Sequence, residues 1–249
     1  MPPTDRPTLV AVAHGSRDPR AVRTVSALLD HVRELRPGLD VRLGHIELNE
    51  PLLGDTLAAL PARGVLVPLL LSRGYHVKHD LPLAAAAHPG AQLRVAEPLG
   101  PHPLLVEALC SRLAEAGFRP EDGTSRSAGV VLASAGSRDP ESAADTRRTA
   151  DLLSERLGGV PVVPAYASAL APTVPTAVRA LTARGRHRIA VASYFAAPGL
   201  FAARSAAAAP WVAAEPLGAH PALARLLLHR YDEALSRSHT PQRLELAAA

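Results

Sequence analysis

The 249-residue chain has little cysteine, few aromatic residues and no long apolar run. Its one cysteine, Cys110, can form neither an internal disulfide nor a cysteine-rich zinc site. The longest apolar stretch, residues 65–72, contains Pro68 and stops at Arg73, far short of the about 18 to 20 residues that a bilayer span needs. We therefore expect no membrane contact, and any metal ion must be held by histidine or carboxylate.

The N-terminal residues contain no apolar segment followed by a small-residue cleavage site, so we expect a cytoplasmic protein. The length allows one or two domains. A hydrophobic content of 47% is sufficient for a packed core and excludes a disordered chain.

The basic charge of the chain, +4 overall with an isoelectric point of about 9.8, lies in one half. Residues 1–123 hold 13 basic and 14 acidic side chains, whereas residues 124–249 hold 14 and 9. The arginines are scattered, and aromatic residues make up only 3%, so the chain has neither a basic run nor a stacking platform. We expect no nucleic-acid binding. Histidine is distributed the other way, with seven in the first half and four in the second.

Two internal matches show that the chain is a duplication. HGSRDP at 14–19 returns as AGSRDP at 135–140, and EPLGPHP at 97–103 returns as EPLGAHP at 215–221. The order is the same and the offsets, 121 and 118 residues, are nearly equal. The polar stretch 119–127 between the copies is typical of a linker. We expect an N-terminal domain over 1–122 and a degenerate C-terminal repeat over 123–249.

Within each copy, short apolar runs alternate with stretches of helical period, which predicts an α/β fold: two tandem domains, each a parallel β-sheet flanked by helices. Asp-Pro at the start of the first helix of each copy predicts an aspartate N-cap followed by proline. The expected strands are 8–13, 41–46, 65–71 and 93–97, then 129–134, 161–167, 188–194 and 211–215, and the expected helices of the first copy are 19–35, 52–62, 80–88 and 102–116.

Three side chains that can bind metal follow the first three predicted strands. Ligand sites in open α/β sheets lie outside the carboxyl ends of the strands. His14, Glu47 and His76 all fall at this edge, so they form a candidate site for a divalent first-row ion and for catalysis. Each alone has a simpler interpretation as a hydrogen-bonded loop residue.

The second copy argues for a joint role of the three residues. His14 becomes Ala135, although the neighbouring Gly-Ser-Arg-Asp-Pro is kept. Aligning Glu50-Pro51 with Ala171-Pro172 pairs Glu47 with Ser168, and aligning Val65 with Ile189 pairs His76 with Leu200. All three candidates are lost together, as expected for members of one site.

Further polar residues near this edge are candidates for binding a substrate. Ser16 lacks the glycine pattern of a hydrolase elbow, but its loop could offer backbone N–H groups to an anion. Lys78 is the only lysine, and a solvated loop lysine is its simpler interpretation; His79 is interpreted as a supporting or exposed residue. The candidate substrate-binding residues are Ser16, Arg17, Arg73, Lys78, His79, Arg138 and Arg204.

Three separated motifs resemble one known family. VAHGSR at 12–17, IELNEP at 46–51 and VPLLLSRGYHVKHDLP at 67–82 are similar to sirohydrochlorin chelatases of the CbiX/SirB type, a class II chelatase family. The resemblance covers nearly the whole chain, including its tandem arrangement. It implies ATP-independent insertion of Fe2+ or Co2+ into sirohydrochlorin, for sirohaem or cobalamin, with metal ligands matching His14, His76 and Glu47. The second half departs from the pattern at each ligand position, so we expect one active site, in the first half and facing the cleft between the domains.

The chemistry of these residues suits metal insertion. Neutral imidazole, with a pKa near ~6.5, can serve as a metal ligand and as a base. Arginine suits the carboxylates of a tetrapyrrole. We expect a monomer with a divalent metal as substrate and no organic cofactor. The alternatives are a tetrapyrrole or metal carrier with little turnover, and a hydrolase or anion-binding protein that uses Ser16. The residues do not choose between iron and cobalt.

Overall fold

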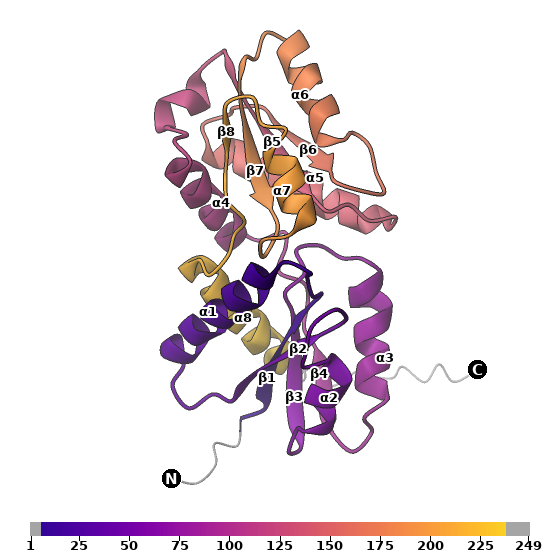
Figure 1. Ribbon diagram of the computed structural model, residues 1–249. Helices are drawn as coiled ribbons and strands as arrows, with labels where there is room; N and C mark the ends of the chain where they lie inside the picture. The colour runs from indigo at the N-terminus through magenta and orange to yellow at the C-terminus, as the bar shows by residue number, and fades with distance from the viewer. Residues whose placement is uncertain (1–5, 238–249) are drawn as a thin grey trace, which may run out of the picture.

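Two four-stranded parallel sheets, one from each half of the chain, form the framework of the protein in a computed structural model (Figure 1). The strand orders are β2-β1-β3-β4 and β6-β5-β7-β8, so the two halves share one topology. The structure describes residues 6–237. The first residues of the chain, on which the expectation of a cytoplasmic protein rests, lie mostly outside the described residues.

The first half follows the expected order of elements. It contains β1 (Thr8–Ala13), α1 (Pro19–Leu35), β2 (Val41–His45), α2 (Leu53–Ala58), β3 (Arg63–Pro68), the π-helical turn η1 (His76–Asp80), α3 (Leu81–Ala86), β4 (Gln92–Val95) and α4 (Pro103–Glu115). Residues 69–71, expected to extend the third strand, belong instead to the loop that leads to η1. Their backbone leaves the ladder after Leu69, and the carbonyl of Leu70 accepts from the N–H of Leu99.

The second half repeats this order. It contains η2 (Pro120–Thr124), β5 (Ala128–Ser134), α5 (Pro140–Arg156), β6 (Val162–Tyr166), α6 (Val174–Ala183), β7 (Arg188–Tyr194), α7 (Leu200–Ala206), β8 (Val212–Ala213) and α8 (Pro221–Ser236). The expected linker is a folded 3-10 turn, because buried Asp122 caps it through the N–H of Arg119 and pairs with Arg188 at 2.8 Å.

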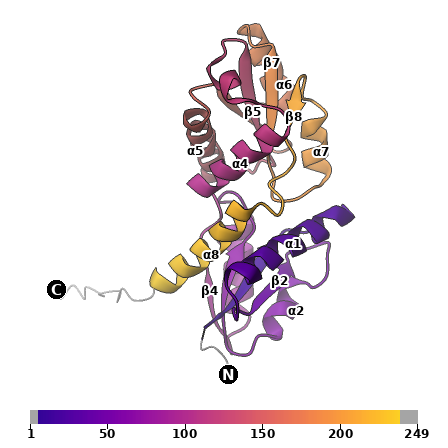
Figure 2. The same cartoon turned by 90° about the vertical axis from the view of Figure 1, so that its left-hand side faces the viewer.

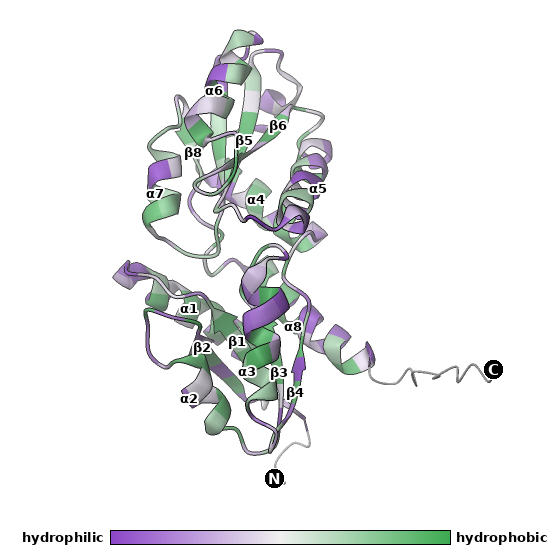
Figure 3. Cartoon of the chain, turned by 90° about the vertical axis from the view of Figure 1, so that its right-hand side faces the viewer, coloured by the Kyte–Doolittle hydropathy of each residue, from purple (hydrophilic) through white to green (hydrophobic). Residues whose placement is uncertain are grey.

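The central strands are buried on both faces, which explains their near-continuous apolar sequences. Because successive side chains of a strand point to opposite faces, Leu9 and Ala11 of β1 join one core cluster while Val10 and Val12 join another. Figure 3 shows the hydrophobic colour of these central strands beside the largely hydrophilic α5.

Aspartate caps start the first helix of each half, as predicted. Asp18 accepts from the N–H of Arg20 and Asp139 from that of Glu141, both at 2.9 Å, and proline follows each cap. The shared Ser-Arg-Asp-Pro sequence therefore orients both helices with their N-termini toward the carboxyl ends of the strands.

The last helix of each half packs on the other half. α4 lies against α5 and β7, whereas α8 lies against α1 and β3, and the two helices contact each other (Figures 1 and 2). Arg36 of α1 and Asp232 of α8 form a bidentate ion pair at 2.6 and 2.7 Å. The expected division at residue 122 thus separates two sequence copies, while in space each sheet takes one covering helix from the other copy.

One core cluster joins the two halves through this exchange. It contains residues of β1, α1 and β3 together with residues of β5, α5 and β7, and α4 and α8 lie between them. Within residues 6–237, no helix is long and apolar enough to cross a membrane.

Candidate metal and substrate site

Hydrogen bonds join the loop after β1 to the loop after β2. The N–H of Glu47 donates to the carbonyl of His14 at 3.0 Å, and the N–H of Ser16 donates to Oδ1 of Asn49 at 2.7 Å. Gly15, at φ +105°, permits this approach, because a Cβ there would lie 1.9 Å from the carbonyl oxygen of Glu47. The backbone thus holds His14 and Glu47 side by side.

The second half builds the same pair of loops without the donors. The N–H of Ser168 donates to the carbonyl of Ala135 at 2.9 Å, and a Cβ on Gly136 would lie 2.1 Å from the carbonyl oxygen of Ser168. This geometry confirms that His14 corresponds to Ala135 and Glu47 to Ser168.

The alignment of the third strands needs a correction of one residue. Leu9 pairs with Val65 and the corresponding Val130 pairs with Ala190, so Val65 matches Ala190 rather than Ile189. The loop that follows is one residue shorter in the second half. The helical segments consequently begin at the two residues compared, His76 in η1 and Leu200 in α7.

The rings of His14 and His76 meet edge to face, with centroids 4.9 Å apart and planes at 86°. Oδ2 of Asp80 lies 2.6 Å from Nδ1 of His76, and Oε1 of Glu47 lies 3.6 Å from Nδ1 of His14. Each imidazole therefore has a carboxylate beside Nδ1, which leaves Nε2 as the nitrogen available to a metal ion; this arrangement is common around metal-binding histidines. Both rings are partly exposed, so an ion can reach them.

Glu47 is beside His14 but does not complete a three-donor site. Among the described residues, no group of three His, Cys, Asp or Glu side chains has the spacing to hold a metal ion. The geometry therefore differs from the expected set of two histidines and a glutamate. Two imidazoles bind a divalent ion incompletely and leave the remaining coordination positions to water or to an incoming ligand.

A cavity of about 1160 Å³ opens beside the two histidines and is lined by both halves of the chain. The exposed apolar side chains Leu48, Tyr75, Leu200 and Phe201 line it together with His14 and His76. An apolar concave surface beside two imidazoles that can bind metal fits a flat organic ligand that carries nitrogen donors.

Few of the expected substrate-binding residues reach this cavity. Ser16 and the exposed Arg17 line it. Exposed His79 lies against the Tyr75 ring instead, with centroids 4.7 Å apart. Arg138 and Arg204 are exposed but lie outside the cavity lining.

Arg73 and Lys78 bind carboxylates of the second half. Arg73 forms a bidentate contact with Asp145, at 3.0 Å from Nε and 2.6 Å from the terminal nitrogen. Nζ of Lys78 lies 2.7 Å from Asp139 and 2.6 Å from Glu141. This differs from the expectation that both cations bind substrate, because the protein itself supplies their acidic partners.

The CbiX family model matches residues 8–116 and again 129–234. The chain belongs to the CbiX family. The two matches fall on the two halves of the repeat; the first ends one residue after α4 and the second ends within α8.

The related proteins carry names of both iron and cobalt chelatases. A sirohydrochlorin ferrochelatase of Bacillus subtilis is 29% identical over 172 residues, which cover 66% of this chain and 64% of that protein. A second ferrochelatase, from Priestia megaterium, is 25% identical over 90% of this chain and 89% of its own length. A sirohydrochlorin cobaltochelatase of Methanopyrus kandleri is 28% identical over 43% of this chain and 95% of its own length. The cobaltochelatase match is thus about half as long as this CbiX family chain.

Solved structures share the fold of both halves. SirB from Bacillus subtilis with Fe3+ superposes with a TM-score of 0.72 at 24% identity, over 94% of this chain and 97% of SirB. A CbiX structure described as the terminal enzyme of sirohaem biosynthesis in denitrifying bacteria gives 0.68 at 21% identity, over 91% and 99%. The tandem arrangement of this CbiX family chain is therefore shared with known folds.

Two features of the CbiX site were missed in the sequence. Asp80 stands at the N-cap position of α3, yet its carboxylate makes no capping bond and lies 2.6 Å from Nδ1 of His76. The i, i+4 spacing of the two residues was a usable signal. Buried Tyr194 donates to the carbonyl of Leu71 at 2.7 Å, a contact across the two halves that no local pattern indicates.

Proposed function

We propose that this protein is an ATP-independent sirohydrochlorin chelatase that inserts Fe2+ or Co2+ into the macrocycle. The observation that carries the proposal is the edge-to-face pair His14 and His76 at the mouth of an apolar cavity built by both halves. The names of the relatives support the substrate, and both metals occur in those names.

The proposed mechanism assigns the metal to the two imidazoles. His14 and His76 hold the divalent ion through Nε2, because Glu47 and Asp80 lie beside the Nδ1 atoms. Two protein donors bind the ion weakly enough for four ring nitrogens to displace them. Insertion releases two pyrrole protons; Glu47, with its side chain about half exposed beside His14, is the proposed acceptor of one of them, and solvent water takes the other.

The cavity supplies the contacts proposed for the macrocycle. Its apolar lining suits the ring faces, and the exposed guanidinium of Arg17 suits a peripheral carboxylate. We further propose that the chain works in the cytoplasm as a monomer without an organic cofactor, since one chain contributes both walls of the cavity.

The test measures the rate at which the free-base absorption of sirohydrochlorin is lost with Co2+, or with Fe2+ under anaerobic conditions, and without ATP. The purified protein is expected to exceed the protein-free rate, while His14→Ala and His76→Ala return to it. His187→Ala, which changes an exposed histidine of the second half, is the matched control.

Two outcomes would overturn the proposal in favour of another function. Tight binding of metal or macrocycle with no rate above the protein-free reaction would indicate a carrier. A hydrolytic activity that resists chelators and is abolished by Ser16→Ala would indicate a hydrolase.

A further inference from the structure

The loop of residues 69–75 connects β3 to η1, whose first residue is His76. The second half of the chain contacts this loop at several successive residues. The carbonyl of Leu71 accepts from the Tyr194 hydroxyl at 2.7 Å, and the hydroxyls of Ser72 and Ser142 lie 2.8 Å apart. Gly74 faces Ser137, because a Cβ built on the glycine would lie at an ordinary van der Waals distance, 3.5 Å, from Oγ of the serine. These contacts follow one another along the chain and end at the π-helical turn.

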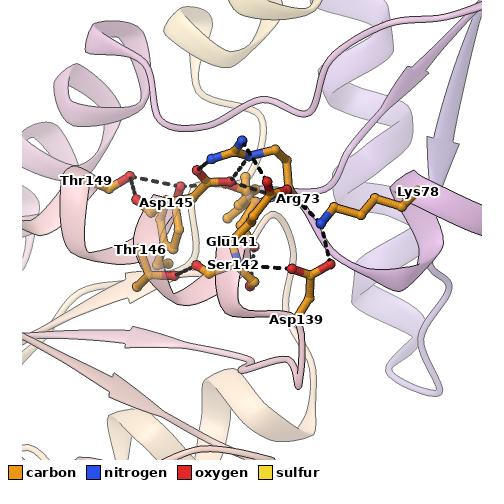
Figure 4. Close-up of polar contacts among 11 residues, drawn as sticks. Arg73, Lys78, Asp139, Glu141, Ser142, Asp145, Thr146 and Thr149 are labelled. Carbon is orange, nitrogen blue, oxygen red and sulfur yellow. Dashed lines mark hydrogen bonds and ion pairs between the residues drawn. The ribbon is translucent and has the colours of Figure 1, made fainter.

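Ionic contacts flank His76 on both sides. Arg73, three residues before it, binds Asp145 through its guanidinium and also through its backbone N–H at 2.9 Å. Only 3% of the Asp145 side chain is exposed. Lys78, two residues after His76, lies between Asp139 and Glu141 at the start of α5 (Figure 4).

These ion pairs are not repeated at the equivalent positions of the two halves. The repeat offset of 121 residues places Arg20 opposite Glu141 and Thr24 opposite Asp145. Arg20 pairs with its own N-cap Asp18 at 2.7 Å. Gly199, which precedes Leu200, faces Ser16, because a Cβ built on this glycine would lie 3.4 Å from Oγ of the serine. The acidic residues thus lie opposite the β3–η1 loop, which leads to the imidazole of His76, whereas the equivalent loop of the second half leads to Leu200.

We propose that the second half, which has lost the metal donors, acts as the positioning element for His76: Asp139, Glu141 and Asp145 hold Arg73 and Lys78 so that the His76 ring stays against His14. Lys78 and Arg73 are positioning residues in this scheme and do not bind substrate. The inference rests on the proposed metal site, but its test does not depend on metal insertion.

The experiment compares Lys78→Met and Glu141→Gln with the conservative Lys78→Arg in the full chain. Arg36→Met is the matched control, because it removes a bidentate ion pair between α1 and α8, away from the site. Hydrogen exchange of the amides of residues 73–80 reports the order of the loop, and titration with Co2+ alone reports the affinity of the imidazole pair.

Lys78→Met and Glu141→Gln are expected to speed amide exchange in residues 73–80 and to raise the Kd for Co2+ roughly three- to five-fold, the scale of a partly exposed ion pair. Lys78→Arg should restore both values, and Arg36→Met should change neither. High salt should weaken Co2+ binding in the unmodified protein more than in Lys78→Met.

Failure of this inference differs from failure of the proposed function. If Lys78→Met keeps the exchange rates and Co2+ affinity of the unmodified protein, the positioning role is wrong even for an active chelatase. If the unmodified protein inserts no metal while Lys78→Met loosens the loop and weakens Co2+ binding, the positioning role stands and the chelatase proposal falls. Arg73→Lys, which keeps a charge for buried Asp145, provides a second variant should Lys78→Met fold poorly.

Discussion

The ring of His14 stands perpendicular to that of His76, with centroids 4.9 Å apart, although 62 residues separate the two in the chain. One ring comes from the loop after β1, and the other from the π-helical turn after β3. Strands β1 and β3 are neighbours in the sheet, so their carboxyl ends bring the two imidazoles to one edge. A π-helical turn is uncommon, and it often marks a functional site.

Asp80→Asn should weaken metal binding without unfolding the protein. The Asp80 carboxylate lies 2.6 Å from Nδ1 of His76 and leaves Nε2 as the nitrogen that we propose binds the ion. Loss of such a partner typically costs about 10- to 100-fold in metal affinity. We expect a Kd for Co2+ raised within that range in a calorimetric titration, with an unchanged thermal midpoint.

The matched control for Asp80→Asn is Glu233→Gln. Glu233 lies 3.5 Å from Nε2 of His229 with the same i, i+4 spacing, but on α8 away from the cavity. Its substitution should leave Co2+ affinity unchanged, and an equal loss in the two variants would contradict the role assigned to Asp80.

Gly15→Ala and Gly136→Ala should both lower the stability of the protein, but only one of them should weaken metal binding. Both glycines have positive φ, and in each case a Cβ would collide with a carbonyl oxygen of the neighbouring loop. Both variants should lose at least about 2 kcal/mol of unfolding free energy in urea. Only Gly15→Ala should also lose Co2+ affinity, by tenfold or more, because only its loop carries a histidine. Equal Co2+ binding by the two variants would contradict this division.

The stability of the protein should fall between pH 7 and pH 5 because of two histidine caps. Nδ1 of His102 accepts from the N–H of Leu104, and Nδ1 of His220 accepts from that of Ala222, both at 3.1 Å. Burial lowers the pKa of both histidines, with nearby positive charge from Arg230 and Arg112 acting in the same direction.

The sign of the effect follows from proton uptake by the unfolded chain. Above the ordinary histidine pKa of about 6.5, both states are neutral and the stabilisation is complete. As the pH falls through that value toward the lowered folded pKa, the unfolded chain binds protons first and the free energy of unfolding declines. Replacement of both caps by asparagine, itself a good N-cap, should flatten this dependence in urea unfolding. Replacement of the exposed His187 by asparagine should leave the pH dependence unchanged. If the double variant keeps the pH dependence of the unmodified protein, the two histidine caps are not its cause.

Tyr194→Phe should cost about 1 to 3 kcal/mol of unfolding free energy, because the buried carbonyl of Leu71 loses its donor. Burial raises the Tyr194 pKa far above its ordinary value, so the hydroxyl stays protonated and able to donate. Leu71 lies in the loop that leads to His76, so we expect weaker Co2+ binding as well.

Tyr231→Phe is the comparison for this substitution. Its hydroxyl donates to the carbonyl of Pro7 at 2.6 Å, so a similar loss of stability is expected. The Co2+ affinity of this variant should be unchanged. If the two variants bind Co2+ equally, the contact between Tyr194 and Leu71 is structural only.

Local pattern determined most of the fold. The near-continuous apolar run of β1 predicts a strand buried on both faces, and Asp18-Pro19 predicts the start of α1 at the residue where it begins. The repeat also led to the two candidate imidazoles, because His14 and His76 are lost together in the second copy.

Tertiary structure decided which charges are available for binding. Arg73 and Lys78 lie next to His76 in the chain and were expected to bind substrate, yet their carboxylate partners come from α5 and its N-cap, more than 60 residues away. Such partners are set by how the two sheets face each other, which no periodicity encodes. The sequence does not predict the exchange of α4 and α8 between the two halves for the same reason. The pattern of an amphipathic helix shows which of its faces is buried, but not which sheet covers that face.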